Sequence, residues 1–204
     1  MELRARKKAL LRDNIVRNAV ELFLDRGFDA VSVEEIVQSS VCSRSTFHRY
    51  FGSKEDLLFP TAGERLAVLE ATLESADQRE DPWSLAREAV SVGLCGFVED
   101  LEPDLQADCI RLWFTETQPR RRYLEIVLEW ERVLNRFFAA RLNVDPKLSL
   151  ECQLLASSIS SALRAALGTA METGQSVHAL INRAFDIIEA GLSADLLALR
   201  VSKD

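Results

Sequence analysis

A short polar and basic stretch near the N-terminus carries the clearest chemical pattern in this chain: Ser43-Arg44-Ser45-Thr46-Phe47-His48-Arg49-Tyr50. Its hydroxyl, guanidinium and imidazole groups donate hydrogen bonds to phosphates and to base edges. An arginine can bond O6 and N7 of guanine with two parallel hydrogen bonds. The pattern therefore indicates contacts with a nucleic acid.

Groups for other chemistry are sparse. The four cysteines (Cys42, Cys95, Cys109 and Cys152) are too far apart to form a metal-ligand pair, and only two histidines could assist them. No nucleophile–base pair or glycine-rich phosphate loop is present in the sequence. We expect no enzyme activity, no metal and no cofactor, and we expect the cysteines to be buried thiols in a reducing compartment.

Two short predicted helices with a tight turn between them would position the polar stretch. Ser32 and Glu35 fit a capping box, which predicts a helix that begins at Ser32 and ends near Ser40. The next helix is expected to begin at Ser43. This is the spacing of a helix-turn-helix. The residues expected to face inward or to anchor the second helix are Val33, Ile36, Val37, Val41 and Phe47.

The helices around this pair have clear start and stop signals. A first helix over residues 6–26 has an apolar stripe at helical spacing, followed by Gly27 as a left-handed cap and by Phe28, which should fold back onto the core. Acidic residues after Ser53 predict a fourth helix. Later helices are predicted at residues 82–100, 104–117, 119–143, 145–174 and 176–199, three of them beginning at prolines. The fold class is therefore all-α with about nine helices.

Charge is distributed unevenly along the chain. Residues 1–54 carry ten Lys or Arg and seven Asp or Glu, whereas the remaining residues carry fifteen and twenty-five. The net charge of −7 therefore hides a basic N-terminal end that could meet an anion. No apolar run approaches the roughly 20 residues that span a bilayer, and the N-terminus lacks a signal peptide, so we expect a cytoplasmic protein with no membrane partner.

Residues 10–58 resemble the DNA-binding domain of the TetR family. The resemblance runs through Ala19–Phe23, Arg26–Phe28, Ser32–Val37, Ser43–Phe51 and Ser53–Leu57. It implies a helix-turn-helix domain over residues 1–52 and a ligand-binding and dimerisation domain over residues 53–204. Two departures concern contact details. Ser40-Val41-Cys42 replaces the usual Ala-Gly-Val turn, which suggests a different turn because Val resists positive φ, and His48 stands where Tyr is common.

The resemblance also implies roles for single residues. Ser32, Thr46, His48 and Lys54 would bind phosphates, Lys54 together with the free N–H groups of the fourth helix. Arg44 and Ser45 are the candidates for base reading; for Arg44, a phosphate contact or a surface salt bridge is the alternative. The basic N-terminus would reach phosphates or a minor groove, or it is a solvated tail. The full candidate set for DNA is Arg4, Arg6, Lys7, Lys8, Ser32, Ser43, Arg44, Ser45, Thr46, His48, Arg49 and Lys54.

The acidic remainder is expected to bind a small molecule and to form a homodimer. The last two helices contain small residues and a wide apolar stripe, which favours a four-helix bundle between two chains; the alternative is that they form the monomer core. Aromatic residues among the central helices predict a pocket, although each of them could simply be core. The candidate ligand-binding residues are Phe97, Arg111, Trp113, Phe114, Thr117, Tyr123, Trp130, Phe138, Arg164 and Met171.

Residues 113–142 are similar to ligand domains of TetR-type regulators of the mycofactocin-system kind, which implies an acyl-CoA or another long lipophilic effector. Arg120-Arg121-Arg122 could hold an anionic group of such a ligand, or could pair with the acidic stretch from Glu99 to Asp108. The expected function is a repressor that leaves a double-stranded DNA operator when its effector binds. An activator of the same fold, a lipid or acyl carrier, and a purely structural helical dimer are the alternatives.

Overall fold

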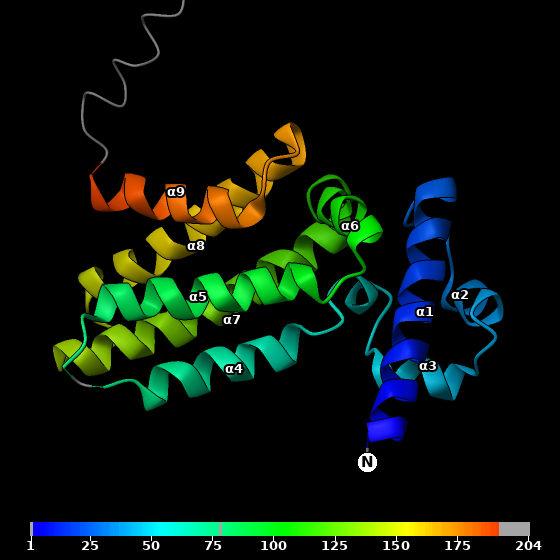
Figure 1. The fold of residues 1–204 in the computed structure, drawn as a ribbon, viewed down its shortest axis with the longest axis horizontal. Coiled ribbons are helices and arrows are strands. Elements are labelled where there is room, and N and C mark those ends of the chain that lie inside the picture. Colours follow the sequence, from blue (N-terminus) through cyan, green and yellow to red (C-terminus); the bar gives the residue numbers. More distant parts are fainter. Residues whose placement is uncertain (1, 78, 192–204) are drawn as a thin grey trace, which may run out of the picture. The chain divides into compact units, whose positions relative to one another are not determined.

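The computed structural model describes residues 2–77 and 79–191, with backbone but not side chains for residues 2–5, 8, 97 and 103. This part of the chain contains nine α-helices, one 3-10 helix and no strand (Figure 1). The predicted all-α fold is therefore confirmed. The described helices pack as two compact units, one of residues 2–67 and 96–128 and the other of residues 68–77, 79–95 and 129–191. This grouping differs from the predicted division after residue 52, which stays a prediction.

The first unit is built on α1 (Glu2–Arg26), with α2 (Val33–Ser39) and α3 (Arg44–Tyr50) following it. The predicted apolar stripe of α1 is buried, and it consists of Ile15, Val16, Ala19, Val20 and Phe23. Gly27 adopts a φ of 85°, as a left-handed cap requires, and Phe28 folds back so that its ring centroid lies 4.7 Å from that of Phe23. Only the start of α1 was placed too late, because the helix already begins at Glu2.

The predicted fourth helix is wrong in its first turns. Residues Glu55–Leu58 form only a short 3-10 helix, η1, and the α-helix α4 begins at Ala62 and ends at Ser75. Pro60 explains the interruption, because it lacks an N–H group and disfavours helical geometry at the preceding residue. Phe59 accordingly has a non-helical φ of −136° and ψ of 52°.

An ion pair and a buried, hydrogen-bonded tryptophan complete the first unit. Arg65 of α4 donates two hydrogen bonds of 2.7 Å to Asp100, and Gly96 makes room because a Cβ there would lie 2.3 Å from the Arg65 guanidinium. Burial alone would raise the pKa of Asp100, but the hydrogen bonds from Arg65 and Thr61 and the charges of Arg65 and Arg12 together lower it. Trp113, on α6 (Pro103–Thr115), is fully buried and donates its Nε1–H to the carbonyl of Leu58 at 3.1 Å.

The second unit combines residues 68–75 of α4, most of α5 (Pro82–Glu99) and the second half of α7 (Thr117–Leu142) with α8 (Leu150–Thr173) and α9 (Val177–Glu189). Arg87 of α5 bonds both Asp186 and Glu189 of α9 at 2.7 Å. Trp130 of α7 packs on Gly93 of α5, where a Cβ would lie 2.8 Å from the indole.

Several predicted helix ends in this unit need correction. The helix α8 begins at Leu150 rather than at residue 145, because Ser149 caps it by accepting from the N–H of Cys152. Gly174, with a φ of 67°, ends it as predicted. The helix α9 ends at Glu189, and Gly191 follows with a φ of 78°; residues 192–199, which were assigned to this helix, lie outside the described residues.

One described helix, α8, is long and apolar enough to cross a bilayer by length and composition. This is weak evidence for a membrane span, because a core helix passes the same test. One side of α8 is buried inside its own unit, through residues such as Ile159, Leu163 and Leu167. The cysteines fit the prediction in part. Cys109 and Cys152 are buried, Cys42 and Cys95 are half-buried, and burial raises the pKa of Cys109 to about 12.

Candidate functional site

The first helix of the pair, α2, is held by a complete capping box. The hydroxyl of Ser32 accepts from the N–H of Glu35, and the Glu35 carboxylate accepts from the N–H of Ser32 at 2.8 Å. Arg26 donates to the same carboxylate at 2.6 Å. The bond from the Ser32 backbone and the Arg26 guanidinium lower the pKa of Glu35 to about 2. Ile36, fully buried, fixes the inner face of α2, as predicted.

The second helix, α3, has a cap and an anchor of its own. Ser43 accepts from the N–H of Thr46 at 3.0 Å, and Phe47 is fully buried. Phe51, directly after the helix, is also buried, and its ring centroid lies 5.6 Å from that of Phe47. These two rings fix which side of α3 faces outward. Arg44, Ser45, His48 and Arg49 are exposed on that outward side.

The turn between α2 and α3 contradicts two expectations. Val41 has a φ of 50°, so the turn keeps the left-handed conformation although no glycine is present. Its side chain is 92% exposed and anchors nothing. Hydrogen bonds from the N–H groups of Val41 and Cys42 to the carbonyls of Gln38 and Val37 close the turn. A β-branched residue at positive φ is strained, so the turn geometry prevails over local preference.

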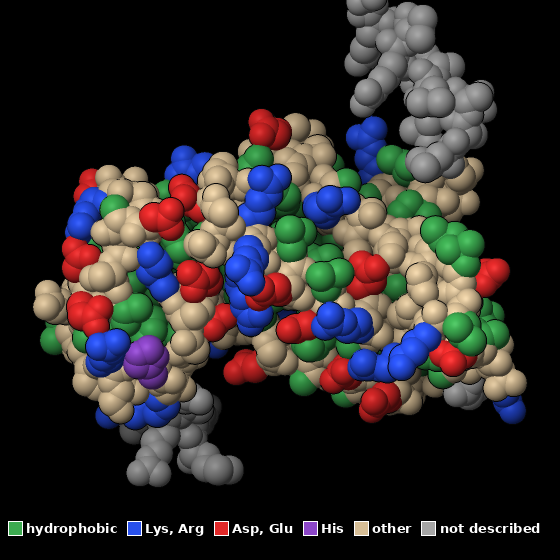
Figure 2. Space-filling view, turned by 180° about the vertical axis from the view of Figure 1, so that it is seen from behind, with side chains coloured by type: hydrophobic (Ala, Val, Ile, Leu, Met, Phe, Trp, Pro, Cys, Tyr) green, Lys and Arg blue, Asp and Glu red, His purple; other side chains and the backbone are tan. Residues whose placement is uncertain are grey.

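The other polar residues of α3 have local contacts that leave them at the surface. The hydroxyls of Ser43 and Thr46 lie 2.8 Å apart. His48 meets the edge of Phe47, and the Arg49 guanidinium lies 5.2 Å from the ring centroid of Tyr50. Figure 2 shows basic side chains next to a histidine on this part of the first unit. The roles predicted for these residues stay predictions, but their placement on one outward helix is observed.

Arg44 has a partner that the sequence reasoning did not identify. Its Nη1 lies 2.8 Å from Oε1 of Glu34 on α2. The surface salt bridge that stood as the alternative for Arg44 is therefore present in the DNA-free chain. The position of Glu34 in the first turn of α2 was visible in the sequence, but its reach to α3 depends on the crossing of the two helices.

Lys54 lies in a place that does not match its predicted environment. Its Nζ donates to the carbonyls of Phe28 at 2.7 Å and Val31 at 2.9 Å, and it lies 4.2 Å from the ring centroid of Phe28. The α-helix whose N–H groups were to assist it begins only at Ala62. The phosphate contact of Lys54 stays a prediction, and its observed bonds support a role in joining the loop after α1 to the segment after α3.

The basic N-terminal residues are helical rather than an extended arm. Residues 4, 6, 7 and 8 belong to the first turns of α1. Arg6 and Lys7 are exposed, whereas the side chains of Arg4 and Lys8 lie outside the described residues. The contacts of these residues with phosphates or a minor groove stay a prediction, for a segment that is helical in the DNA-free chain.

The candidate ligand-binding residues fall into both units. In the first unit, the Tyr123 ring stacks 6.2 Å from Trp113 and lies 5.4 Å from Phe114. Trp113 and Tyr123 are buried. Arg111 is exposed and pairs with Asp108 at 3.0 Å, and Thr117 is exposed. The three aromatic residues are therefore brought together, as a packed cluster.

In the second unit, Trp130 and Phe138 are buried in α7, Met171 is half-buried and Arg164 is exposed. The Nε1–H of Trp130 is buried and has no acceptor among the described residues. The side chain of Phe97 lies outside the described residues.

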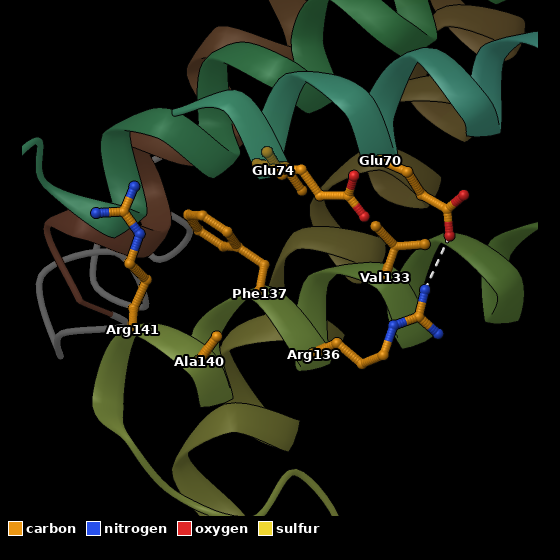
Figure 3. Close-up of a pocket in the computed structure, with 8 residues that line it drawn as sticks. Glu70, Glu74, Val133, Arg136, Phe137, Ala140 and Arg141 are labelled. Atoms are coloured by element: carbon orange, nitrogen blue, oxygen red, sulfur yellow. Dashed lines mark hydrogen bonds and ion pairs between the residues drawn. The ribbon is translucent and has the colours of Figure 1, made fainter. Parts of the chain in front are cut away.

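A hollow of about 300 Å³ lies between α4 and α7 of the second unit (Figure 3). We call it the α4–α7 hollow. Leu73, Val133, Phe137 and Ala140 give it an apolar lining, and its charged residues are Glu70, Glu74, Arg136 and Arg141. Arg136 pairs with Glu70 at 2.8 Å, and Arg141 donates to the carbonyl of Asp77 at 2.8 Å. None of the ten candidates lines it.

A second, more open hollow of about 400 Å³ lies at the start of α7 in the first unit. Thr117, Arg120 and Arg121 contribute its polar lining. Arg122 bonds Asp56 at 2.8 Å instead of the acidic stretch proposed for it. That stretch pairs elsewhere, Asp100 with Arg65 and Asp104 with Arg17. Among the described residues, no cluster of three or more potential metal ligands exists.

One face of α8 is apolar and exposed. Leu150 and Leu154, one helical turn apart, are 64% and 56% exposed. Ser161 and Ala165, small residues on the same face, are exposed as well. The opposite face is buried in the core, so α8 has both a core side and an uncovered apolar side.

A capped helix pair that presents an exposed basic helix, attached to a larger helical body, defines a helix-turn-helix DNA-binding protein. Comparison with known families gives the same result. Residues 15–59 match the family described as "Bacterial regulatory proteins, tetR family", and residues 65–193 match the "MftR C-terminal domain". The chain belongs to the TetR family of transcriptional regulators and carries an MftR-type C-terminal domain. Members of this family are DNA-binding regulators and not enzymes.

Two relatives illustrate the match. The HTH-type transcriptional regulator TcmR of Streptomyces glaucescens is 34% identical over 70% of this chain, a region that spans 65% of TcmR. A protein of Mycobacterium tuberculosis described as a mycofactocin biosynthesis regulator, MftR, is 24% identical over 92% of this chain and 93% of its own length.

A solved structure shares the fold. FadR from Thermus thermophilus, a TetR-family repressor determined in complex with lauroyl-CoA, aligns with a TM-score of 0.56 and 21% identity. The alignment covers 89% of this chain and 95% of FadR.

Proposed function

We propose that this regulator is a homodimeric repressor that binds a double-stranded DNA operator through α3 and releases it when a lipophilic effector binds. The observation that carries the DNA part is the exposed side of α3, fixed by the Ser43 cap and by buried Phe47. Arg44 and Ser45 would read bases, and Thr46, His48 and Arg49 would contact phosphates or neighbouring bases. Such a protein acts in the cytoplasm, where its operator lies.

The homodimer is proposed through α8 and α9. The exposed apolar side of α8 supports it, because an uncovered apolar helix face of this kind marks an interaction site. A two-fold dimer would place one α3 in each of two major grooves about 34 Å apart. Leu154→Glu should give a monomer in light scattering, whereas Leu142→Glu, at an exposed leucine on α7, should stay dimeric. A dimeric L154E variant would remove α8 from the interface.

The effector is proposed to be an acyl-CoA or a similar long lipophilic compound. The α4–α7 hollow supports an apolar ligand group, because half of its lining residues are apolar and its two acidic and two basic side chains balance in formal charge, with Arg136 paired to Glu70. The lauroyl-CoA complex of FadR gives the first compound to test.

The test measures release of a fluorescently labelled operator by its fluorescence anisotropy. Lauroyl-CoA should release the labelled operator, whereas free coenzyme A and an unrelated hydrophobe should not. Ala140→Phe fills the α4–α7 hollow from an exposed position, and Ala71→Phe adds the same bulk to an exposed position on α4 outside the hollow. Only A140F should raise the effector concentration that releases half of the operator, by about tenfold or more. A tenfold rise corresponds to a loss of about 1.4 kcal/mol of binding free energy.

Two results would contradict the effector proposal. Equal release by all three compounds would remove the acyl-CoA class, and unchanged sensitivity of A140F would remove the hollow. In a transcription assay, the loss of operator binding should raise expression; a fall would make the protein an activator.

A further inference from the structure

Glu34 and Arg44 form a contact between the two helices of the helix-turn-helix. Glu34 lies in the first turn of α2, and Arg44 is the first residue of α3. Their side chains are 55% and 69% exposed, so the pair lies on the outward surface. The ion pair joins α2 to α3 directly.

The fold does not depend on this contact. The helix α2 has its own cap in Ser32 and Glu35 and its own anchor in Ile36. The helix α3 has the Ser43 cap and the Phe47 anchor. Exposed ion pairs contribute little to stability, because water screens them and two side chains lose freedom. The pair can therefore be removed at little cost in stability.

The geometry of the contact leaves part of the guanidinium available. Oε1 of Glu34 lies 2.8 Å from Nη1 of Arg44, and Nε and Nη2 of Arg44 donate no hydrogen bond to a described residue. The edge formed by Nε and Nη2 is therefore open. An edge of this kind can donate two parallel hydrogen bonds, as O6 and N7 of guanine require.

We propose that Glu34 is a positioning residue for base readout, which holds Arg44 by Nη1 and presents its free edge to a guanine in the major groove. The proposal rests on the proposed base-reading role of Arg44. Held in this way, the side chain loses less freedom on binding, which favours the one arrangement that fits the base. The carboxylate also compensates the positive charge of Arg44, so the phosphates of unrelated sequences attract it less.

The test is the base preference of four purified proteins. Duplexes with randomised half-sites are selected on the wild-type full chain, and the preferred duplex is then compared with versions changed at each base pair. The variants are Glu34→Gln, Arg44→Ala and Asp25→Asn. Asp25 is an exposed acidic residue of α1 in the same unit, so it removes the same charge without touching Arg44.

Arg44→Ala should reduce the preference for guanine at one position by about 5- to 150-fold, the range of a bidentate contact. Glu34→Gln should reduce the preference at that same position by about threefold or more, while binding to random duplexes stays equal or becomes tighter. Asp25→Asn should leave the preference unchanged. Thermal unfolding of each variant shows whether the fold is retained, and a change in stability alone would weaken all duplexes alike.

The outcomes separate the two proposals. If Arg44→Ala loses the guanine preference and Glu34→Gln keeps it, the positioning role is overturned and base reading by Arg44 stands. If Arg44→Ala keeps the wild-type preference, base reading by Arg44 fails and the role of Glu34 fails with it. Loss of preference at one shared base pair in both variants supports the inference.

Discussion

The helix-turn-helix and the α4–α7 hollow both place charged side chains on buried apolar supports, yet they use charge differently. On α3, His48 and Arg49 are exposed and no acidic partner for them is present among the described residues. In the hollow, Arg136 is paired with Glu70 and Arg141 bonds backbone carbonyls. Open cations suit a polyanion, whereas a lining of balanced formal charge around apolar residues suits an uncharged, lipophilic group. The difference separates a surface for DNA from a site for an effector.

The largest expected effect would break the first region. Phe47→Ala removes the buried anchor of α3 and should lower the free energy of unfolding by about 3–5 kcal/mol. Operator binding should be lost even where the remaining fold is retained. Denaturant unfolding and anisotropy measure the two effects, with Phe114→Ala, a half-buried aromatic outside the helix-turn-helix, as the comparison. Operator affinity that survives in F47A would mean that α3 is positioned by something else.

A smaller effect is expected from substitution of Lys54. It distinguishes a structural role of this lysine from a contact with a DNA phosphate. Lys54→Met keeps much of the side-chain length but leaves the carbonyls of Phe28 and Val31 without their donor, at a cost of about 1.5–3 kcal/mol of stability. At a temperature where the variant is fully folded, its salt dependence of DNA binding should equal that of the wild type. A salt slope reduced by about one would instead show that Lys54 contacts a phosphate.

A substitution in the turn between α2 and α3 should raise stability instead of lowering it. Val41→Gly relieves the strain of a φ of 50° and exposes no buried surface, because the valine is 92% exposed. The greater freedom of glycine in the unfolded chain offsets part of the gain, so stability should rise by up to about 1 kcal/mol. Thermal unfolding measures the change. A destabilised V41G variant would show that the valine makes a contact that offsets its backbone strain.

Breaking the ion pair at the hollow should have a minor effect on the fold. The side chains of Arg136 and Glu70 are 60% and 40% exposed, so Arg136→Gln should cost less than about 1 kcal/mol. Operator affinity without effector should not change. Arg49→Gln, on α3, removes the same charge and should weaken operator binding. Equal losses of affinity in the two variants would erase the proposed difference between the regions.

The last prediction concerns the dependence of stability on acidic pH. The pKa of Glu35 is about 2 in the fold, below its usual value of 4.5, so its contribution to stability is complete above pH 4.5 and is lost as the pH falls towards 2. Glu35→Gln should therefore flatten the pH dependence of unfolding between pH 5 and pH 2. Equal slopes for the variant and the wild type would contradict the lowered pKa.

The helix-turn-helix could be predicted closely because local residue types determine it. Ser32 with Glu35, Ser43 with Thr46, and the spacing of Ile36 and Phe47 each require only a few neighbouring residues. Val41 could not be predicted this way, because its preference opposes the φ that the hydrogen bonds of the turn require. Local preference is a weak guide where several tertiary contacts demand one geometry.

The α4–α7 hollow could not be predicted from local residue types. Its walls come from α4 and α7, about sixty residues apart, and its residues are a mixture of Glu, Arg and small or apolar types. The sequence indicated aromatic residues as pocket walls, but Trp113 and Tyr123 are packed within the core instead. Which helix faces leave space between them depends on side-chain packing across the whole unit.

The two buried tryptophans have a practical consequence for spectroscopy. Trp113 lies in the first unit, bonded to a carbonyl and stacked on Tyr123, whereas Trp130 lies in the second unit against Gly93. A chain that keeps only one of them, with Trp83 of α5 also replaced, would carry an intrinsic fluorophore that reports on one unit alone. Emission followed during DNA addition in one such chain, and during effector addition in the other, would time the two responses separately without any attached dye.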